Sequence, residues 1–160
     1  MFSSAPLPWL RTTTVYTSSS PTFTGSTRST ISSTSAGKVK IISTVPSLDT
    51  PVCDTETRRF NTEAGKLGND IVVLTVSVDL PMAMKRWCGA AGVDKVHCLS
   101  DYLTHDFGTA WGVRIHEIGL LARAIFVVDK NDKVTYVQLV KEVADEPDYT
   151  AALAAAKAAV

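Results

Sequence analysis

The pattern of apolar and polar residues divides the chain into a polar N-terminal segment and a regular remainder. Serine and threonine fill more than half of positions 12–36, and no acidic residue precedes Asp49. From residue 37 onward, short β-branched apolar runs alternate with segments of mixed polarity. We therefore expect residues 1–36 to lie outside the folded domain, which we place at 37–160.

The alternation within the regular part predicts an α/β fold with a central mixed sheet flanked by helices. The β-branched runs are typical of buried strands, and Pro81 suits a first helical position, as Gly68 suits a C-cap. An Asn-Asp turn signal predicts a late antiparallel hairpin, whereas the early strands should be parallel. The predicted strands cover 39–45, 70–79, 96–100, 120–129 and 134–141, and the predicted helices cover 53–68, 81–92, 105–112 and 148–160.

Composition and charge exclude several classes of function. The chain has 160 residues and 45% apolar content, which suits one domain with a proper core. With 16 basic and 16 acidic residues, it offers no electrostatic reason to expect nucleic acid or a membrane surface as a partner. Its apolar runs are too short to span a bilayer, and no secretory signal is evident. Three cysteines, an odd number, indicate thiols kept for chemistry in a reducing, cytoplasmic compartment.

Cys53 is the first candidate for chemistry, because it falls in the first turn of a predicted helix, after a strand and a short loop. Free N–H groups and the positive end of the helix dipole favour a thiolate there. By position alone, a lone cysteine at a strand–helix junction is more often a small buried apolar residue. The neighbours favour chemistry, since the hydroxyl of Thr50 is within reach of the sulfur and Pro46 would shield it from water.

This arrangement suits the reduction of a peroxide. A thiolate attacks one oxygen along the O–O axis, and donors must meet the negative charge on the departing oxygen. Thr50 offers a hydroxyl, and Arg123 is the candidate guanidinium. An arginine in the middle of an apolar strand is costly unless it is paired or functional. The alternative for Arg123 is a side chain at a strand edge that reaches solvent.

Several separated motifs, in the same order, resemble the peroxiredoxins, and among them the atypical two-cysteine subfamily of bacterial thiol peroxidases. PSLDTPVC at 46–53 matches the active-site pattern of proline, three residues, threonine, two residues and cysteine. The resemblance runs from about residue 37 to the end. The other motifs that carry it are TPVCDTETRRFN, VSVDLPMAMKRWCGAAG, LSDY, LLARAIFVVD and EPDYTAALAAAK.

The resemblance implies a thioredoxin-like fold and a role for each residue of the site. Cys53 would be the peroxidatic cysteine, oxidised to a sulfenic acid, with Thr50, Pro46 and Arg123 in support. Cys88 matches the resolving cysteine, which would attack the sulfenic acid and close a disulfide with Cys53 in the same chain. The resemblance also implies hydrogen peroxide and alkyl hydroperoxides as substrates, thioredoxin as the reductant, and a homodimer.

The remaining candidates for chemistry carry less weight. Cys53 and Arg59 have the C-x5-R spacing of cysteine phosphatases and arsenate reductases, but Asp54 and Glu56 would disfavour a bound anion. Glu56 also stands where a thioredoxin-type exchanger needs its second cysteine. Cys98 matches no role in the family and is expected to pack in the core. The three histidines form no ligand cluster with the cysteines, so we expect neither a metal nor a cofactor.

Three interpretations of residues 1–36 are open. Their composition is typical of a disordered tail, and it also fits an organelle transit peptide. Members of the resembled family have a β-hairpin and further strand and helix segments here. The third interpretation, which we favour, is a frame-shifted or mis-started translation, and reading the upstream nucleotides in the other frames would test it. If the segment is instead the protein's own, it replaces these elements and the sheet lacks cover, so a non-catalytic protein of thioredoxin-like fold is the alternative function.

Overall fold

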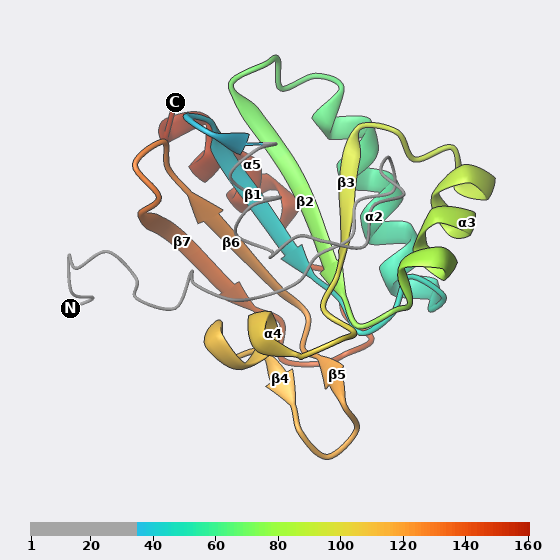
Figure 1. Cartoon of the computed structure of the whole chain (residues 1–160). Coiled ribbons are helices and arrows are strands. Elements are labelled where there is room, and N and C mark those ends of the chain that lie inside the picture. The colour runs from blue at the N-terminus through green and yellow to red at the C-terminus, as the bar shows by residue number, and fades with distance from the viewer. Residues whose placement is uncertain (1–34) are drawn as a thin grey trace.

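The computed structural model describes residues 35–160, so the interpretations of 1–36 fall almost entirely outside it (Figure 1). Within the described residues, a central five-stranded sheet has the order β3-β2-β1-β6-β7, and β4 and β5 form a separate small sheet. The strands are β1 Val39–Thr44, β2 Ile71–Ser77, β3 Val96–Ser100, β4 Arg114–Ile115, β5 Leu120–Leu121, β6 Ala124–Val128 and β7 Val134–Leu139. The helices are α2 Pro51–Ala64, α3 Pro81–Ala91, α4 Asp106–Ala110 and α5 Tyr149–Ala158.

The directions of the strands confirm the predicted mixed sheet. β1 is parallel to β2, and β2 is parallel to β3. β6 is antiparallel to both β1 and β7. β1 and β2 are buried along their whole length because both of their faces are covered, whereas the side chains of β7 alternate between partly buried and exposed.

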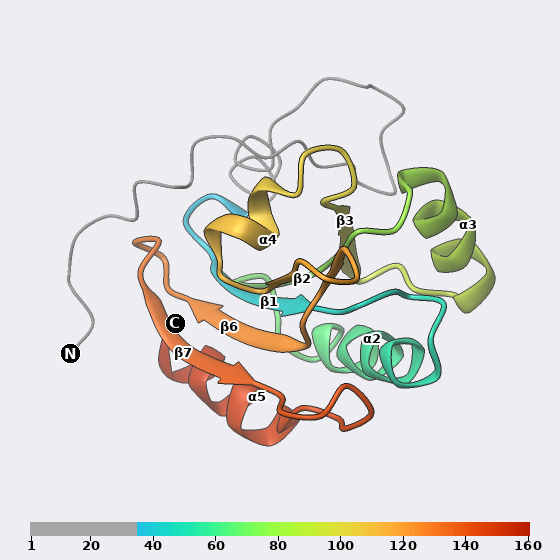
Figure 2. The ribbon, with the colours of Figure 1, turned by 90° about the horizontal axis from the view of Figure 1, so that it is seen from below.

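The two faces of the sheet carry separate apolar cores. One core joins the sheet to Phe60 of α2, Met84 of α3 and Tyr149 of α5. The other contains Phe107 of α4 and Val113. Figure 2 shows the same division, with α2 and α5 on one side of the sheet and α4 on the other. The helices therefore flank the sheet, and the cysteines lie in the first of the two cores.

The ends of α2 differ from the prediction. The helix begins at Pro51, two residues before the predicted start, because the fixed φ of proline suits a first helical position. It ends at Ala64, with Gly65 rather than Gly68 as its C-cap. Gly68 has a φ of +72° in the turn before β2, a left-handed conformation that favours glycine. The early start places Cys53 firmly within the first turn.

The apolar run 120–129 was predicted to be one strand, but it forms two. It is interrupted at Ala122 and Arg123, because β5 pairs with β4 in the small sheet while β6 joins the central sheet. The hydroxyl of Thr44 on β1 donates to the carbonyl of Ala122 at 2.7 Å and lies 3.3 Å from that of Ala124. Arg123 is therefore in a fixed connection between two strands rather than in the middle of one.

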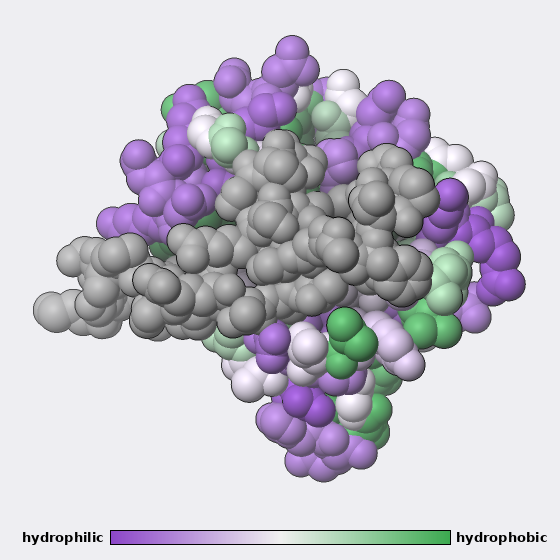
Figure 3. Space-filling model, in the orientation of Figure 1, coloured by the Kyte–Doolittle hydropathy of each residue, from purple (hydrophilic) through white to green (hydrophobic). Residues whose placement is uncertain are grey.

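The exposed surface is mainly polar where it can be seen. In Figure 3 hydrophilic residues prevail around the outline of the molecule, with hydrophobic residues scattered among them. The larger exposed apolar side chains include Met82, Leu103 and Ile118. None of the helices between residues 35 and 160 has the length and apolar character needed to cross a membrane.

Candidate active site

Cys53 lies where β1 gives way to α2 through the loop 45–50. Its side chain is buried, with 0% exposure. It is the third residue of α2, in the turn whose N–H groups point toward the helix start without helical acceptors. The positive end of the helix dipole therefore acts on a sulfur that is buried in the core.

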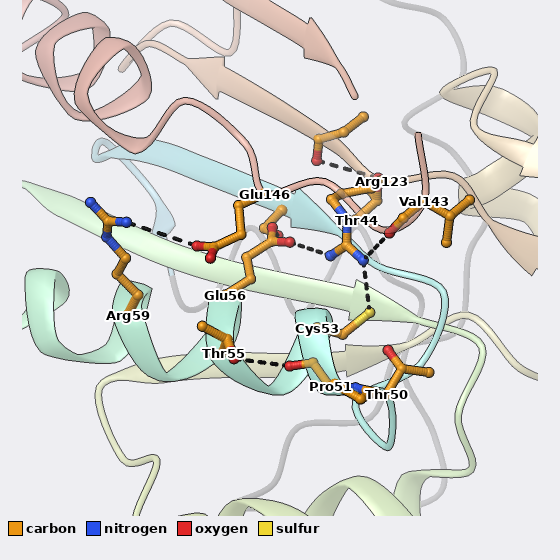
Figure 4. A network of polar contacts seen from close by, with 12 residues as sticks. Thr44, Thr50, Pro51, Cys53, Thr55, Glu56, Arg59, Arg123, Val143 and Glu146 are labelled. Carbon is orange, nitrogen blue, oxygen red and sulfur yellow. Dashed lines mark hydrogen bonds and ion pairs between the residues drawn. The ribbon is translucent and has the colours of Figure 1, made fainter. Parts of the chain in front are cut away.

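The guanidinium of Arg123 contacts this sulfur. Its Nη2 donates to Cys53 Sγ at 3.4 Å and to the carbonyl of Val143 at 2.9 Å, while Nη1 pairs with the carboxylate of Glu56 (Figure 4). Arg123 is only 2% exposed, so the alternative of a solvent-reaching arginine at a strand edge is wrong. Its Nε has no hydrogen-bond partner among the described residues, which leaves one donor of the guanidinium unused.

Glu56 is a member of the site that sequence reasoning missed. It lies three residues after Cys53, so the two side chains share a face of α2, and it is fully buried. Ser43 on β1 donates to its second oxygen at 2.6 Å. Burial raises the pKa of Glu56, and the hydrogen bonds from Ser43 and Arg123 oppose this rise. The signal in the sequence was an acid one helical turn after the cysteine, facing a predicted buried strand.

Glu56 in turn keeps Arg123 charged. Burial alone would lower the pKa of Arg123, but the hydrogen bond and the negative charge of Glu56 raise it above its ordinary value. The carboxylate also fixes one end of the planar guanidinium, and the carbonyl of Val143 fixes another. The remaining hydrogen bond of the guanidinium is the one to the Cys53 sulfur.

Thr50 does not make the contact with the sulfur that was expected from its spacing. Its hydroxyl donates to the carbonyl of Ser47 at 2.9 Å, which closes the turn before α2. Its carbonyl accepts a hydrogen bond from the N–H of Asp54 at 2.9 Å, and this bond closes the first turn of the helix. Figure 4 shows Thr50 next to Cys53 at the helix start. Thr50 thus shapes the loop around the sulfur.

The loop that carries Pro46 is held to the sheet by Asp79. Ser47 Oγ donates to one oxygen of Asp79 at 2.7 Å, and the N–H of Leu48 donates to the other at 2.8 Å. Ser77 Oγ donates to the same carboxylate at 2.7 Å. Pro46 is buried in this loop. The anchoring explains why the residues before Cys53 have a defined position although they lack regular structure.

Cys88 lies apart from the Arg123 cluster, with Cys98 as its partner. Its sulfur, on α3, is 3.4 Å from that of Cys98 on β3. Both residues are buried, as was expected for Cys98, and all three cysteines are free. The hydrogen bond between the two thiols lowers the pKa of Cys88, and the same bond, together with burial, raises the pKa of Cys98. The pairing of these two thiols was not predicted.

The rival interpretation of Cys53 as part of a C-x5-R loop finds no support in the position of Arg59. The guanidinium of Arg59 lies over the ring of Tyr149, 3.9 Å from its centroid, and 3.8 Å from the carboxylate of Glu146. The guanidinium at the sulfur comes from Arg123 instead. In the part of the chain that the structure describes, no group of three or more His, Cys, Asp and Glu residues is placed to hold a metal ion.

Comparison with known proteins places this geometry in a family. A family model described as Redoxin matches residues 15–153. A thiol peroxidase of Oceanobacillus iheyensis is 58% identical over 117 residues, which are 73% of this chain and 71% of that protein. A thiol peroxidase of Bacillus subtilis is 56% identical over 124 residues, 78% of this chain and 74% of that one.

Solved structures agree with these relatives on the fold. A peroxiredoxin-like protein from Aquifex aeolicus superposes with a TM-score of 0.76 at 37% identity, covering 91% of this chain and 82% of that one. Together with the Redoxin match, this confirms that the mixed sheet and its helices form a thioredoxin-like fold.

Proposed function

The chain belongs to the redoxin family and is a thiol-dependent peroxidase of the peroxiredoxin type, and from this premise we propose that Cys53 is the residue that attacks the peroxide. The observation that carries the proposal is the contact of 3.4 Å between Arg123 Nη2 and the buried sulfur of Cys53. A buried thiolate at a helix start, next to a fixed cation, is a nucleophile beside a ready donor.

The reaction at Cys53 is a displacement on oxygen. The thiolate forms a bond to one peroxide oxygen, the O–O bond breaks, and its electron pair leaves with the other oxygen. That oxygen takes up a proton and departs as water or an alcohol, while Cys53 becomes a sulfenic acid. Arg123 stabilises the charge on the departing oxygen, and its unused Nε is a donor for this purpose.

Glu56 is the positioning residue for this step. It binds the end of the guanidinium opposite to the sulfur and leaves the Nη2 edge directed at Cys53. Ser43 holds the carboxylate in place from β1. Thr50 and Pro46 support the same step indirectly, by closing and packing the loop before α2.

The second step of the proposal is resolution by Cys88. Its thiolate attacks the sulfenic acid of Cys53, expels hydroxide, and closes a disulfide within the chain. In the reduced structure the Cys88 sulfur contacts Cys98 rather than Cys53. Because the two sulfurs contact other groups and not each other, the start of α2 and the end of α3 open locally in this step to bring them together.

The partners of the cycle are proposed on the resemblance and on the thiols. Thioredoxin would reduce the disulfide and restore the two thiols, and the chain would act as a homodimer. All three cysteines are free, which suits a reducing compartment, and we assign the protein to the cytoplasm on this ground.

Peptide mapping tests the assignment of Cys53 and Cys88. Reduced protein, shown to be folded by circular dichroism, is treated with one equivalent of hydrogen peroxide and alkylated. In samples quenched early, we expect a disulfide between Cys53 and Cys88 of the same chain, and we expect Cys53→Ser to show none. Folded wild-type protein that stays fully reduced would overturn the proposal.

A further inference from the structure

The two sulfurs of Cys88 and Cys98 are already placed for a disulfide. They lie 3.4 Å apart in the same core, with Cys88 5% and Cys98 1% exposed. Since a disulfide bond is about 2.05 Å long, they have to approach by only about 1.4 Å. No comparable contact joins Cys53 and Cys88, whose partners are Arg123 and Cys98 respectively.

We propose that Cys98 is a third redox residue, which takes over the disulfide that Cys53 and Cys88 form. This inference rests on the proposed function, because the peroxide and Cys53 supply the first disulfide. Cys98 attacks Cys88 Sγ, a bond forms between these two sulfurs, and the Cys53–Cys88 bond breaks. The electron pair leaves with Cys53 as a thiolate, and the proton of Cys98 passes to water. One disulfide is exchanged for another, so no further oxidant is needed.

The folded architecture drives this exchange forward. A Cys53–Cys88 disulfide holds α2 and α3 in a locally opened state, because their sulfurs are not in contact in the folded protein. A disulfide between Cys88 and Cys98 joins α3 to the neighbouring strand β3 and keeps both in place. Closing the helices therefore brings Cys98 to the sulfur that it attacks.

The environment of Cys53 favours its departure. As the thiolate leaves Cys88, it returns to the guanidinium of Arg123, which lies 3.4 Å away in the folded site. A thiolate that its surroundings stabilise is a good leaving group in disulfide exchange. Arg123 would thus act twice in one cycle, first on the oxygen that leaves the peroxide and then on the sulfur that leaves the disulfide.

The hydrogen bond between the thiols puts the two attacks in order. In the reduced protein the hydrogen bond between the two thiols lowers the pKa of Cys88 and raises that of Cys98, so Cys88 ionises more readily. The bond to Cys88 is also the first cause, before burial, of the raised pKa of Cys98. Once Cys88 is part of a disulfide, it has no thiol left that would ionise ahead of Cys98. We therefore expect Cys88 to react first and Cys98 second.

The exchange changes the number of peroxide equivalents that each chain can consume. It frees Cys53 while the oxidising equivalents stay in the Cys88–Cys98 disulfide. Without any reductant, each chain then consumes a second equivalent of peroxide, which leaves Cys53 as a sulfenic acid. A chain that stops at Cys53–Cys88 consumes only the first equivalent, because it has no free peroxidatic thiol.

Rapid mixing with peroxide, followed by acid quench, alkylation and tryptic mapping, tests the exchange in the full chain. Trypsin cleaves at Lys40, Arg58, Arg86 and Lys95, so each cysteine falls on its own peptide. We expect the Cys53–Cys88 crosslink to rise first and then to fall as Cys88–Cys98 rises. In Cys98→Ser the first crosslink should persist and the second equivalent of peroxide should remain unconsumed. Cys98→Ala is the second variant, should serine disturb the core.

Each outcome separates the inference from the function on which it rests. A persistent Cys53–Cys88 crosslink in the wild type, with no Cys88–Cys98, overturns the exchange and leaves the peroxidatic role of Cys53 intact. Formation of Cys88–Cys98 in Cys53→Ser at the wild-type rate also overturns it, since the disulfide would not come from Cys53. Absence of every crosslink in the folded wild type overturns the proposed function and the inference together.

Discussion

The sulfurs of Cys53 and Cys88 lie in one core, yet their neighbours give them different chemistry. Cys53 meets the guanidinium of Arg123, which is held by a buried carboxylate. Cys88 meets a second thiol, that of Cys98. A fixed cation makes a sulfur a good nucleophile and a good leaving group. A neighbouring thiol instead gives a sulfur a partner for a disulfide. The partner of a cysteine, rather than its burial, therefore separates the two sites.

Replacing Cys53 or Cys88 by serine should have the largest effects on activity. We expect Cys53→Ser to lose peroxidase activity entirely, because serine offers no thiolate. Cys88→Ser should still reduce one equivalent of peroxide and then stop at the Cys53 sulfenic acid. A coupled assay with thioredoxin, together with trapping of the sulfenic acid by a dimedone-type reagent, separates the two. Equal losses with no trapped adduct in Cys88→Ser would contradict the division of roles.

Removing the cation of the first site is the next largest change. Arg123→Met should lower the rate constant for oxidation of Cys53 on the order of 10²–10³-fold, as expected for the loss of a donor to a developing charge. It should also lower the free energy of unfolding by about 3–5 kcal/mol, because Glu56 would be buried without its partner. Stopped-flow fluorescence and urea unfolding measure the two quantities.

Paired variants distinguish catalysis from stability at Arg123. In Arg123→Met with Glu56→Gln, most of the lost stability should return while the rate stays low, since no unpaired charge is left buried. Arg86→Met, at an exposed position of α3, serves as the control and should leave both quantities nearly unchanged. A double variant that recovers its rate along with its stability would show that Arg123 has only a structural role.

The pH dependence of alkylation tests the interaction between the thiols of Cys88 and Cys98. The hydrogen bond with Cys98 lowers the pKa of Cys88, so in Cys98→Ala this pKa should rise and alkylation of Cys88 should move to higher pH. Cys98→Ser keeps a donor at the same position and should keep the wild-type pH profile more closely. The measurement is the rate of alkylation by iodoacetamide against pH, in a Cys53→Ser background. Identical profiles for the serine and alanine variants would contradict the role of the donor.

The loop before α2 should show the smallest effect. Thr50→Val removes the hydroxyl that donates to Ser47, which should cost about 1 kcal/mol of stability and slow peroxide reduction only slightly. Thr50→Ser keeps the hydroxyl and serves as the matched control. A loss of rate in Thr50→Val as large as that in Arg123→Met would instead indicate a direct contact between Thr50 and the reacting atoms.

The local patterns were sufficient for much of the fold. The strand at 96–100 was predicted with its observed bounds, and the directions of the strands followed from their order and from the late turn signal. The helix that carries Cys53 was also predicted, although with a start at 53 rather than at Pro51. The split of 120–129 into β5 and β6 was missed, since it depends on the distant strands with which each half pairs.

Residue types and their order were enough to identify the groups with suitable chemistry: a cysteine at a helix start, an arginine costly to bury, and a second cysteine in the motif of a known family. Their partners followed only from the packing of distant elements. Glu56 meets Arg123 across 67 residues, and Cys88 meets Cys98 only because α3 packs against β3. Thiols and charges interact over a few ångströms, and such distances between separate elements are set by how their side chains pack, which no local pattern specifies.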